Sequence, residues 1–140
     1  DTARSRGLGD VYKRQLVLDI HHHWVRTGEY IQANDDRVKR VIDSWRGVRP
    51  TMHYSYSRDE WLSPAYPDGK MHEGIHDMQT LLDKGCKKQK LRAHSDMLPN
   101  RAVNEWALTF LPNLDIQVEA KAKNLAAEQL HTQAQELDLV

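Results

Sequence analysis

The sequence predicts an α/β fold in which the strands run parallel and the helices lie outside the sheet. Three short segments, residues 17–20, 48–55 and 115–120, have the apolar and β-branched content of buried strands. A segment with the apolar period of an amphipathic helix follows each of them along the chain. Because neighbouring parallel strands need long, usually helical connections, this order indicates a parallel sheet.

The first 15 residues are predicted not to belong to the native protein. Residues 10–15, DVYKRQ, match the in-frame translation of GATGTGTATAAGAGACAG, a transposon end used in DNA library preparation. A genuine basic arm is the alternative. The leader holds four basic and two acidic residues, so residues 16–140 keep 16 basic and 18 acidic residues, a net charge of −2. We expect the native segment to start at Leu16, in mid-protein, as the C-terminal part of a larger domain.

Composition narrows the class of protein. A chain of 140 residues is the size of one domain, and its single cysteine, Cys86, excludes an internal disulfide framework. No apolar run approaches the roughly 20 residues of a membrane span, and no signal peptide is evident. We therefore expect a cytoplasmic protein with no membrane partner and no obligate protein partner.

The stretch VLDIHHH, residues 17–23, has the highest density of side chains that can bind a metal ion. A short buried strand is expected to lead into Asp19, His21, His22 and His23. Carboxylate and imidazole are ordinary ligands of zinc, manganese and iron, so the stretch predicts a metal site. A histidine-rich turn or a purification tag is the alternative, but tags are longer, terminal and not preceded by a strand.

The next elements are a loop, a helix and a strand. Residues 24–33 are predicted to be loop, and Asn34 or Asp35 can cap a helix that Gly47 ends. The buried face of this helix is expected to hold Val38, Val41, Ile42 and Trp45. Strand 48–55 then brings His53 near its C-terminal end.

A long excursion separates this strand from the next helix. Residues 57–70 are predicted to be loop and residues 72–84 a helix, with His72 and His76 as surface or loop residues. A basic cluster follows, formed by Lys84, Lys87, Lys88, Lys90 and Arg92. It is either a solvated turn or a patch that contacts phosphate.

The C-terminal third repeats the helix and strand order. Asn100 is predicted to cap a helix whose buried face holds Val103, Trp106, Ala107 and Phe110, and Pro112 to end it. Glu119 stands at the end of strand 115–120. A last helix is expected from about residue 122, with Leu125, Ala126 and Leu130 on its apolar face and a polar, frayed tail from residue 133.

Residues that can bind metal recur where these strands end. Asp19 and His22 follow the first strand, His53 ends the second, Glu119 ends the third, and His94 lies in the loop between. One such residue is ordinary, but four successive positions are hard to explain by packing. This is the pattern expected at the C-terminal face of a (β/α)8 barrel with a metal centre.

Four motifs carry a resemblance to a known family. They are LDIHHH at residues 18–23, MHYS at 52–55, AHSD at 93–96 and VEAKAKNLA at 118–126. In this order they resemble the UV damage endonucleases, which are related in fold to endonuclease IV and xylose isomerase. The resemblance implies that residues 16–140 are about the last three βα units of a TIM barrel. It also implies a metal-dependent enzyme that cuts damaged double-stranded DNA 5′ to UV photoproducts.

The resemblance also assigns roles to residues. It implies a cluster of divalent metals, usually Mn²⁺, with Mg²⁺, Zn²⁺ or Co²⁺ as alternatives, and the ligands Asp19, His22, His53, His94 and Glu119. Glu119, which would bridge metals, and His94 are the expected catalytic residues, and Asp96 could orient a ligand histidine. The expected DNA-binding residues are Lys87, Lys88, Lys90 and Arg92. The family often has a lysine where this chain has Thr51.

Two rival interpretations remain open at the level of sequence. The first is another metal-dependent barrel of the xylose isomerase type, such as an abasic-site endonuclease or a sugar isomerase. The second is an inactive piece of a barrel, whose unpaired strand edges and apolar faces would cause aggregation or dimerisation.

Overall fold

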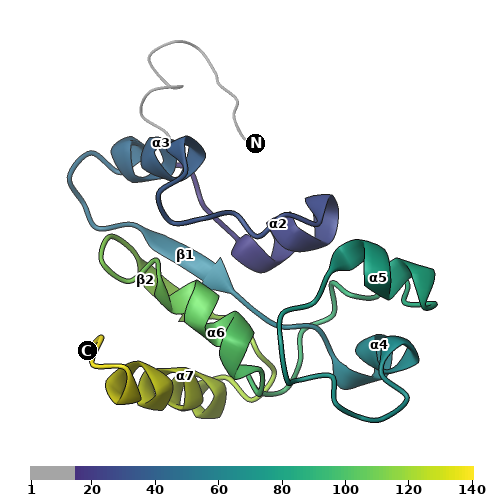
Figure 1. Cartoon of the computed structure of the whole chain (residues 1–140). Coiled ribbons are helices and arrows are strands. Elements are labelled where there is room, and N and C mark those ends of the chain that lie inside the picture. Colours follow the sequence, from purple (N-terminus) through teal and green to yellow (C-terminus); the bar gives the residue numbers. More distant parts are fainter. Residues whose placement is uncertain (1–14) are drawn as a thin grey trace.

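The computed structural model describes residues 15–140, and the predicted leader lies outside this part except for Gln15. Its sheet pairs strand β1 (Thr51–Tyr54) with strand β2 (Asp115–Val118) in parallel (Figure 1). Thr51 pairs with Asp115 and Tyr54 with Val118, so both strands end at the same level. The parallel α/β prediction is confirmed in this form, with strands shorter than the predicted segments.

The first predicted strand is reduced to a single bridge. Asp19 pairs in parallel with His53, whose amide donates a hydrogen bond of 2.8 Å to the Leu18 carbonyl. Helix α2 (Ile20–Thr27) begins directly afterwards, so the predicted loop over residues 24–33 is wrong for residues 24–27 and confirmed for residues 28–33. Asp19 caps the helix, which lets the chain turn from extended to helical within one residue.

The other predicted helices are present with modified limits. Helix α3 (Asp36–Ser44) is capped by Asp35, and helix α6 (Arg101–Leu108) by Asn100, as predicted. Helix α7 spans Asn124–Glu136.

The C-terminal tail differs from its prediction. The sequence predicts that Gln133 begins a frayed tail. In the structure Gln133 is buried and accepts a hydrogen bond of 3.0 Å from Asn104. This polar contact extends α7, whereas the apolar pattern alone suggested an earlier end. Leu125, predicted on the apolar face, is instead 63% exposed.

The excursion after β1 is more ordered than predicted. Helix α4 (Asp59–Leu62) and the 3-10 helix η1 (Ser63–Ala65) lie in the expected loop, and helix α5 (Met78–Asp83) covers only the end of the expected helix. His76 is buried, and its two ring nitrogens lie 2.7 Å from the hydroxyls of Tyr56 and Tyr66. The surface interpretation of His76 is therefore wrong, because tyrosine hydroxyls satisfy its ring inside the protein.

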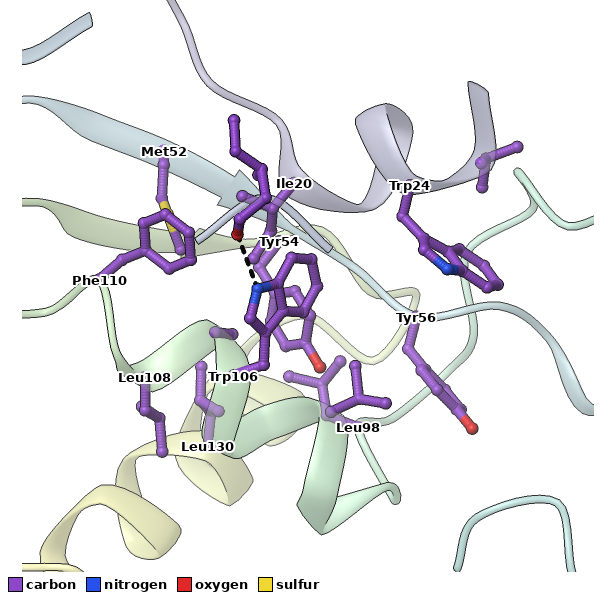
Figure 2. Packing of buried hydrophobic residues seen from close by; sticks show 14 of the residues in the cluster. Ile20, Trp24, Met52, Tyr54, Tyr56, Leu98, Trp106, Leu108, Phe110 and Leu130 are labelled. Carbon is purple, nitrogen blue, oxygen red and sulfur yellow. Dashed lines mark hydrogen bonds between the residues drawn. The ribbon is translucent and has the colours of Figure 1, made fainter. Parts of the chain in front are cut away.

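The helices bury one face of the sheet. Met52 and Tyr54 are fully buried and pack with Ile20, Trp106 and Phe110 in one cluster (Figure 2). Thr51 and His53, which alternate with these two residues along β1, point to the opposite face and stay partly exposed. Accordingly the apolar face of the sheet forms the core, and its polar face is open. Among residues 15–140 no helix has the length and apolar character needed to cross a membrane.

Candidate metal centre

Three residues gather on the open side of the strand ends. Asp19, His53 and Glu119 can each offer one ligand atom, and these three atoms lie within 4.8 Å of one another. All three residues are partly exposed. Within the described part of the chain this is the group whose spacing suits one metal ion.

The backbone register explains why these residues meet. Asp19 forms a bridge with His53, and His53 pairs with Gln117, so the side chains of Asp19, His53 and Gln117 lie on one face of the sheet. Glu119 lies two residues beyond Gln117 and returns to that face, and its amide donates a hydrogen bond of 2.8 Å to the Tyr54 carbonyl. His53 Nδ1 then lies 3.5 Å from Glu119 Oε2.

The donor set fits a divalent cation. Two carboxylates and one imidazole suit manganese, iron or zinc, since each of these accepts oxygen and nitrogen ligands. Asp19 already uses Oδ1 to accept the amide hydrogen of His22 at 2.8 Å. That bond fixes the carboxylate and leaves its second oxygen available to a metal.

The two other predicted ligands lie outside the group of three. His22 is exposed on the first turn of α2, where it lines a groove of about 290 Å³ with Arg26, Lys88 and Arg92. His94 is partly buried and lines a larger, open groove of about 930 Å³ together with Glu119. The prediction that all five ligands form one cluster therefore stays a prediction.

Backbone bonds hold the His94 loop between two strand ends. His94 forms an antiparallel bridge with Ser57, and the Ser95 amide donates to the Tyr56 carbonyl at 2.8 Å. On the other side the Lys121 amide donates to the Ser95 carbonyl at 3.0 Å. The loop is thereby fixed next to Glu119. Asp96, expected beside a ligand histidine, instead pairs with Arg58 at 3.3 Å.

His21, to which the family resemblance assigns no role, is buried next to the proposed ligands. It is buried between two serines, with Nδ1 2.9 Å from Ser55 Oγ and Nε2 3.1 Å from Ser57 Oγ. Burial, assisted by the nearby imidazoles of His94 and His22, lowers the pKa of His21 to about 3, so its ring is neutral at pH 7. Its two partners lie 34 and 36 residues further along the chain, so the sequence carried no local signal for this burial. His23 points elsewhere, to Glu29 at 2.7 Å.

The four predicted DNA-binding residues have different surroundings in the structure. Lys88 Nζ donates to the Arg26 carbonyl at 2.8 Å, and Arg92 lines both the His22 groove and the Glu119 groove. Lys90 lies over the Trp61 ring, 5.1 Å from its centroid. Lys87 is exposed.

Two further cations lie beside Glu119. They are Lys121 and Lys123, which line the larger groove and were not predicted, although the VEAKAKNLA motif contains them.

Comparison with known proteins gives one match. A family model described as UV-endonuclease UvdE matches residues 8–140, nearly the whole chain. No curated protein and no solved structure matches the chain significantly.

Proposed function

This chain belongs to the UV-endonuclease UvdE family, and on that premise we propose that it is part of a metal-dependent endonuclease that nicks DNA 5′ to UV photoproducts. The observation that carries the proposal is the group formed by Asp19, His53 and Glu119, because three metal-type ligands converge where parallel strands end. Arg92, Lys121 and Lys123 line the same groove as Glu119, and their positive charges support a phosphate-containing substrate.

We assign five residues to the metal centre. Asp19, His53 and Glu119 form its base, and His22 and His94 join from the rim. When bound, divalent metals such as Mn²⁺ would supply Lewis acidity and an activated water for phosphodiester hydrolysis. The two oxygens of the Glu119 carboxylate would let this residue contact a second ion if the centre holds a cluster.

The residues of the chain supply position and charge for the reaction. Glu119 and His94 line the same groove, so a phosphate that enters it meets both of them. Backbone bonds fix the His94 loop, and the His94 ring packs edge to face on His21, so a donor held here would stabilise developing charge with little reorganisation. On this basis Glu119 and His94 are our candidates for the catalytic residues.

The DNA strand would follow the basic rim, defined as Arg26, Lys88, Arg92, Lys121 and Lys123. These cations line the two grooves that Arg92 joins, and each can neutralise a backbone phosphate. Lys87 and Lys90 extend the rim. Contacts of this kind position DNA without reading its sequence, as an enzyme that recognises lesions requires.

The fold that we propose is the C-terminal part of a (β/α)8 barrel. Support comes from the parallel strands with level ends, the helices on the outer face and the polar inner face of the sheet. In such a barrel the open polar face would form the interior near the metals. The other strands of such a barrel would pair with the edges of this sheet.

A nicking assay tests the function. Supercoiled plasmid is irradiated, depurinated or left untreated, and incubated with Mn²⁺ and the chain joined to the upstream half of a family member. Nicking of irradiated plasmid that chelator abolishes is the expected result. Nicking restricted to abasic plasmid would assign the chain to abasic-site repair, and no nicking of any DNA, with metal bound, would overturn the endonuclease proposal.

A further inference from the structure

We propose that His21 is a positioning residue, whose ring hydrogen bonds tie together three segments that carry proposed metal ligands, those of Asp19 and His22, of His53 and of His94. The inference rests on the proposed metal centre and deepens it. His21 itself is no ligand in this arrangement, because it is 6% exposed and serine hydroxyls occupy both of its ring nitrogens.

The hydrogen bonds around His21 form a directed chain. Ser57 Oγ donates its only hydrogen to the Leu91 carbonyl at 2.6 Å, so it must accept from His21 Nε2. A neutral imidazole with its hydrogen on Nε2 has an acceptor at Nδ1, and Ser55 Oγ is the donor to it. The chain thus runs from Ser55 through His21 and Ser57 to Leu91, and it fixes the tautomer of the ring.

Each link of this chain belongs to a segment with proposed ligands. His21 lies between Asp19 and His22 on the first turn of α2. Ser55 lies two residues after His53, and Ser57 pairs with His94. The rings of His21 and His94 are 6.1 Å apart and edge to face.

A displaced His21 ring would therefore move ligands on both sides of the site. Outer groups that orient metal ligands typically change metal affinity by about 10- to 100-fold when removed.

A packing role alone does not account for these contacts. An apolar ring of similar size would fill the space, but it would leave the buried hydroxyls of Ser55 and Ser57 with fewer partners. Both serines are 1% exposed, so water cannot replace the imidazole. His76 has buried bonds of the same kind away from the ligands, whereas the bonds of His21 join the segments that carry them.

Variants of Ser57 provide the test, since they break the chain without removing a ring from the core. Ser57→Ala deletes the acceptor for His21 Nε2, and Ser57→Thr keeps a hydroxyl there. Ser63→Ala is the control, because Ser63 is exposed and its hydroxyl donates to the nearby Glu60 carbonyl at 3.2 Å, within the same short helical segment. Mn²⁺ affinity of the full chain is measured by titration well below the melting temperature.

The expected result is an affinity loss of about tenfold or more in Ser57→Ala, recovered in Ser57→Thr and absent in Ser63→Ala. A lower melting temperature with unchanged Mn²⁺ affinity would assign His21 a structural role and overturn the inference. If the original chain binds no Mn²⁺, the group of Asp19, His53 and Glu119 does not hold the ion in this chain, and the inference fails with it. Nitrogen-15 NMR of His21 adds a second check, because a hydrogen on Nδ1 rather than Nε2 would contradict the directed chain.

Discussion

His53 at the end of β1 and Glu119 just beyond β2 face each other, with Nδ1 and Oε2 3.5 Å apart. Their contact follows from the parallel register, since His53 pairs with Gln117 and Glu119 is the next residue of the same strand to point to that face. Asp19 reaches the same point through its bridge with His53. Three segments that are far apart in sequence thus deliver one ligand group each.

Replacing Glu119 by glutamine should remove metal binding and spare the fold. The Glu119 side chain is 31% exposed and at the site edge, so the neutral amide costs little stability but loses the anionic oxygen that a divalent cation requires. We expect Mn²⁺ affinity to fall at least about tenfold. Glu128→Gln, on the exposed side of α7, is the matched control. Equal affinity in the two variants would remove Glu119 from the site.

Neutralising the basic rim should weaken DNA binding in a salt-dependent way. Arg92→Gln and Lys121→Gln each remove one proposed phosphate contact, so the slope of log affinity against log salt should shrink by about 0.9 per variant. Lys39→Gln, on α3, controls for the loss of a charge elsewhere. The measurement is fluorescence anisotropy with irradiated duplex DNA at several salt concentrations. Slopes that match the Lys39 variant would place the DNA elsewhere.

Local sequence signals were sufficient for the caps and the parallel pairing. Asn100 caps α6 as predicted, because its side chain accepts a hydrogen bond from the Val103 amide, an interaction contained within four successive residues. The convergence of Asp19, His53 and Glu119 was also predictable, because parallel strands end at one edge. The barrel stays a prediction, and so do the roles of the five ligands.

The residues whose burial the sequence did not predict have one feature in common. His21, His76 and Gln133 are polar residues that the fold buries, and polar residues are expected at the surface unless partners are known. Their partners, such as Ser57 for His21 and Tyr66 for His76, lie 36 and 10 residues away in sequence. Only the three-dimensional arrangement brings these hydroxyls to the rings, so no local pattern could have assigned the burial.

Replacing Asn104, a buried polar residue of the core, should lower the free energy of unfolding strongly. It is 1% exposed, accepts from the Tyr54 hydroxyl at 2.7 Å, and donates to the Leu98 carbonyl at 2.9 Å and to Gln133. Asn104→Ala leaves these buried groups unpaired and should lower the free energy of unfolding by at least about 2 kcal/mol.

Urea unfolding monitored by circular dichroism measures this loss for Asn104→Ala. The control is Asn113→Ala, an exposed position where a change within about 0.5 kcal/mol is expected. A similar small change at Asn104 would show that water or a shifted neighbour replaces the amide.

The stability of the protein should fall in mild acid because of His76. Burial, with a smaller contribution from the charge of His72, lowers the pKa of His76 from 6.5 to about 4. Between these two values the unfolded chain binds a proton that the folded protein does not. The free energy of unfolding is therefore fully retained above pH 6.5 and decreases as the pH falls toward 4, by up to about 1.4 kcal/mol per pH unit from this residue.

The variant His76→Gln isolates this contribution. Glutamine keeps a donor and an acceptor for the hydroxyls of Tyr56 and Tyr66 but does not titrate, so its unfolding free energy should change less with pH. Between pH 6.5 and pH 5 the original chain should lose about 1.6 kcal/mol more than the variant. Urea unfolding of both proteins at several pH values, without metal, gives the comparison. Parallel pH profiles would mean that His76 takes up its proton in the folded protein, as a ring near the surface would.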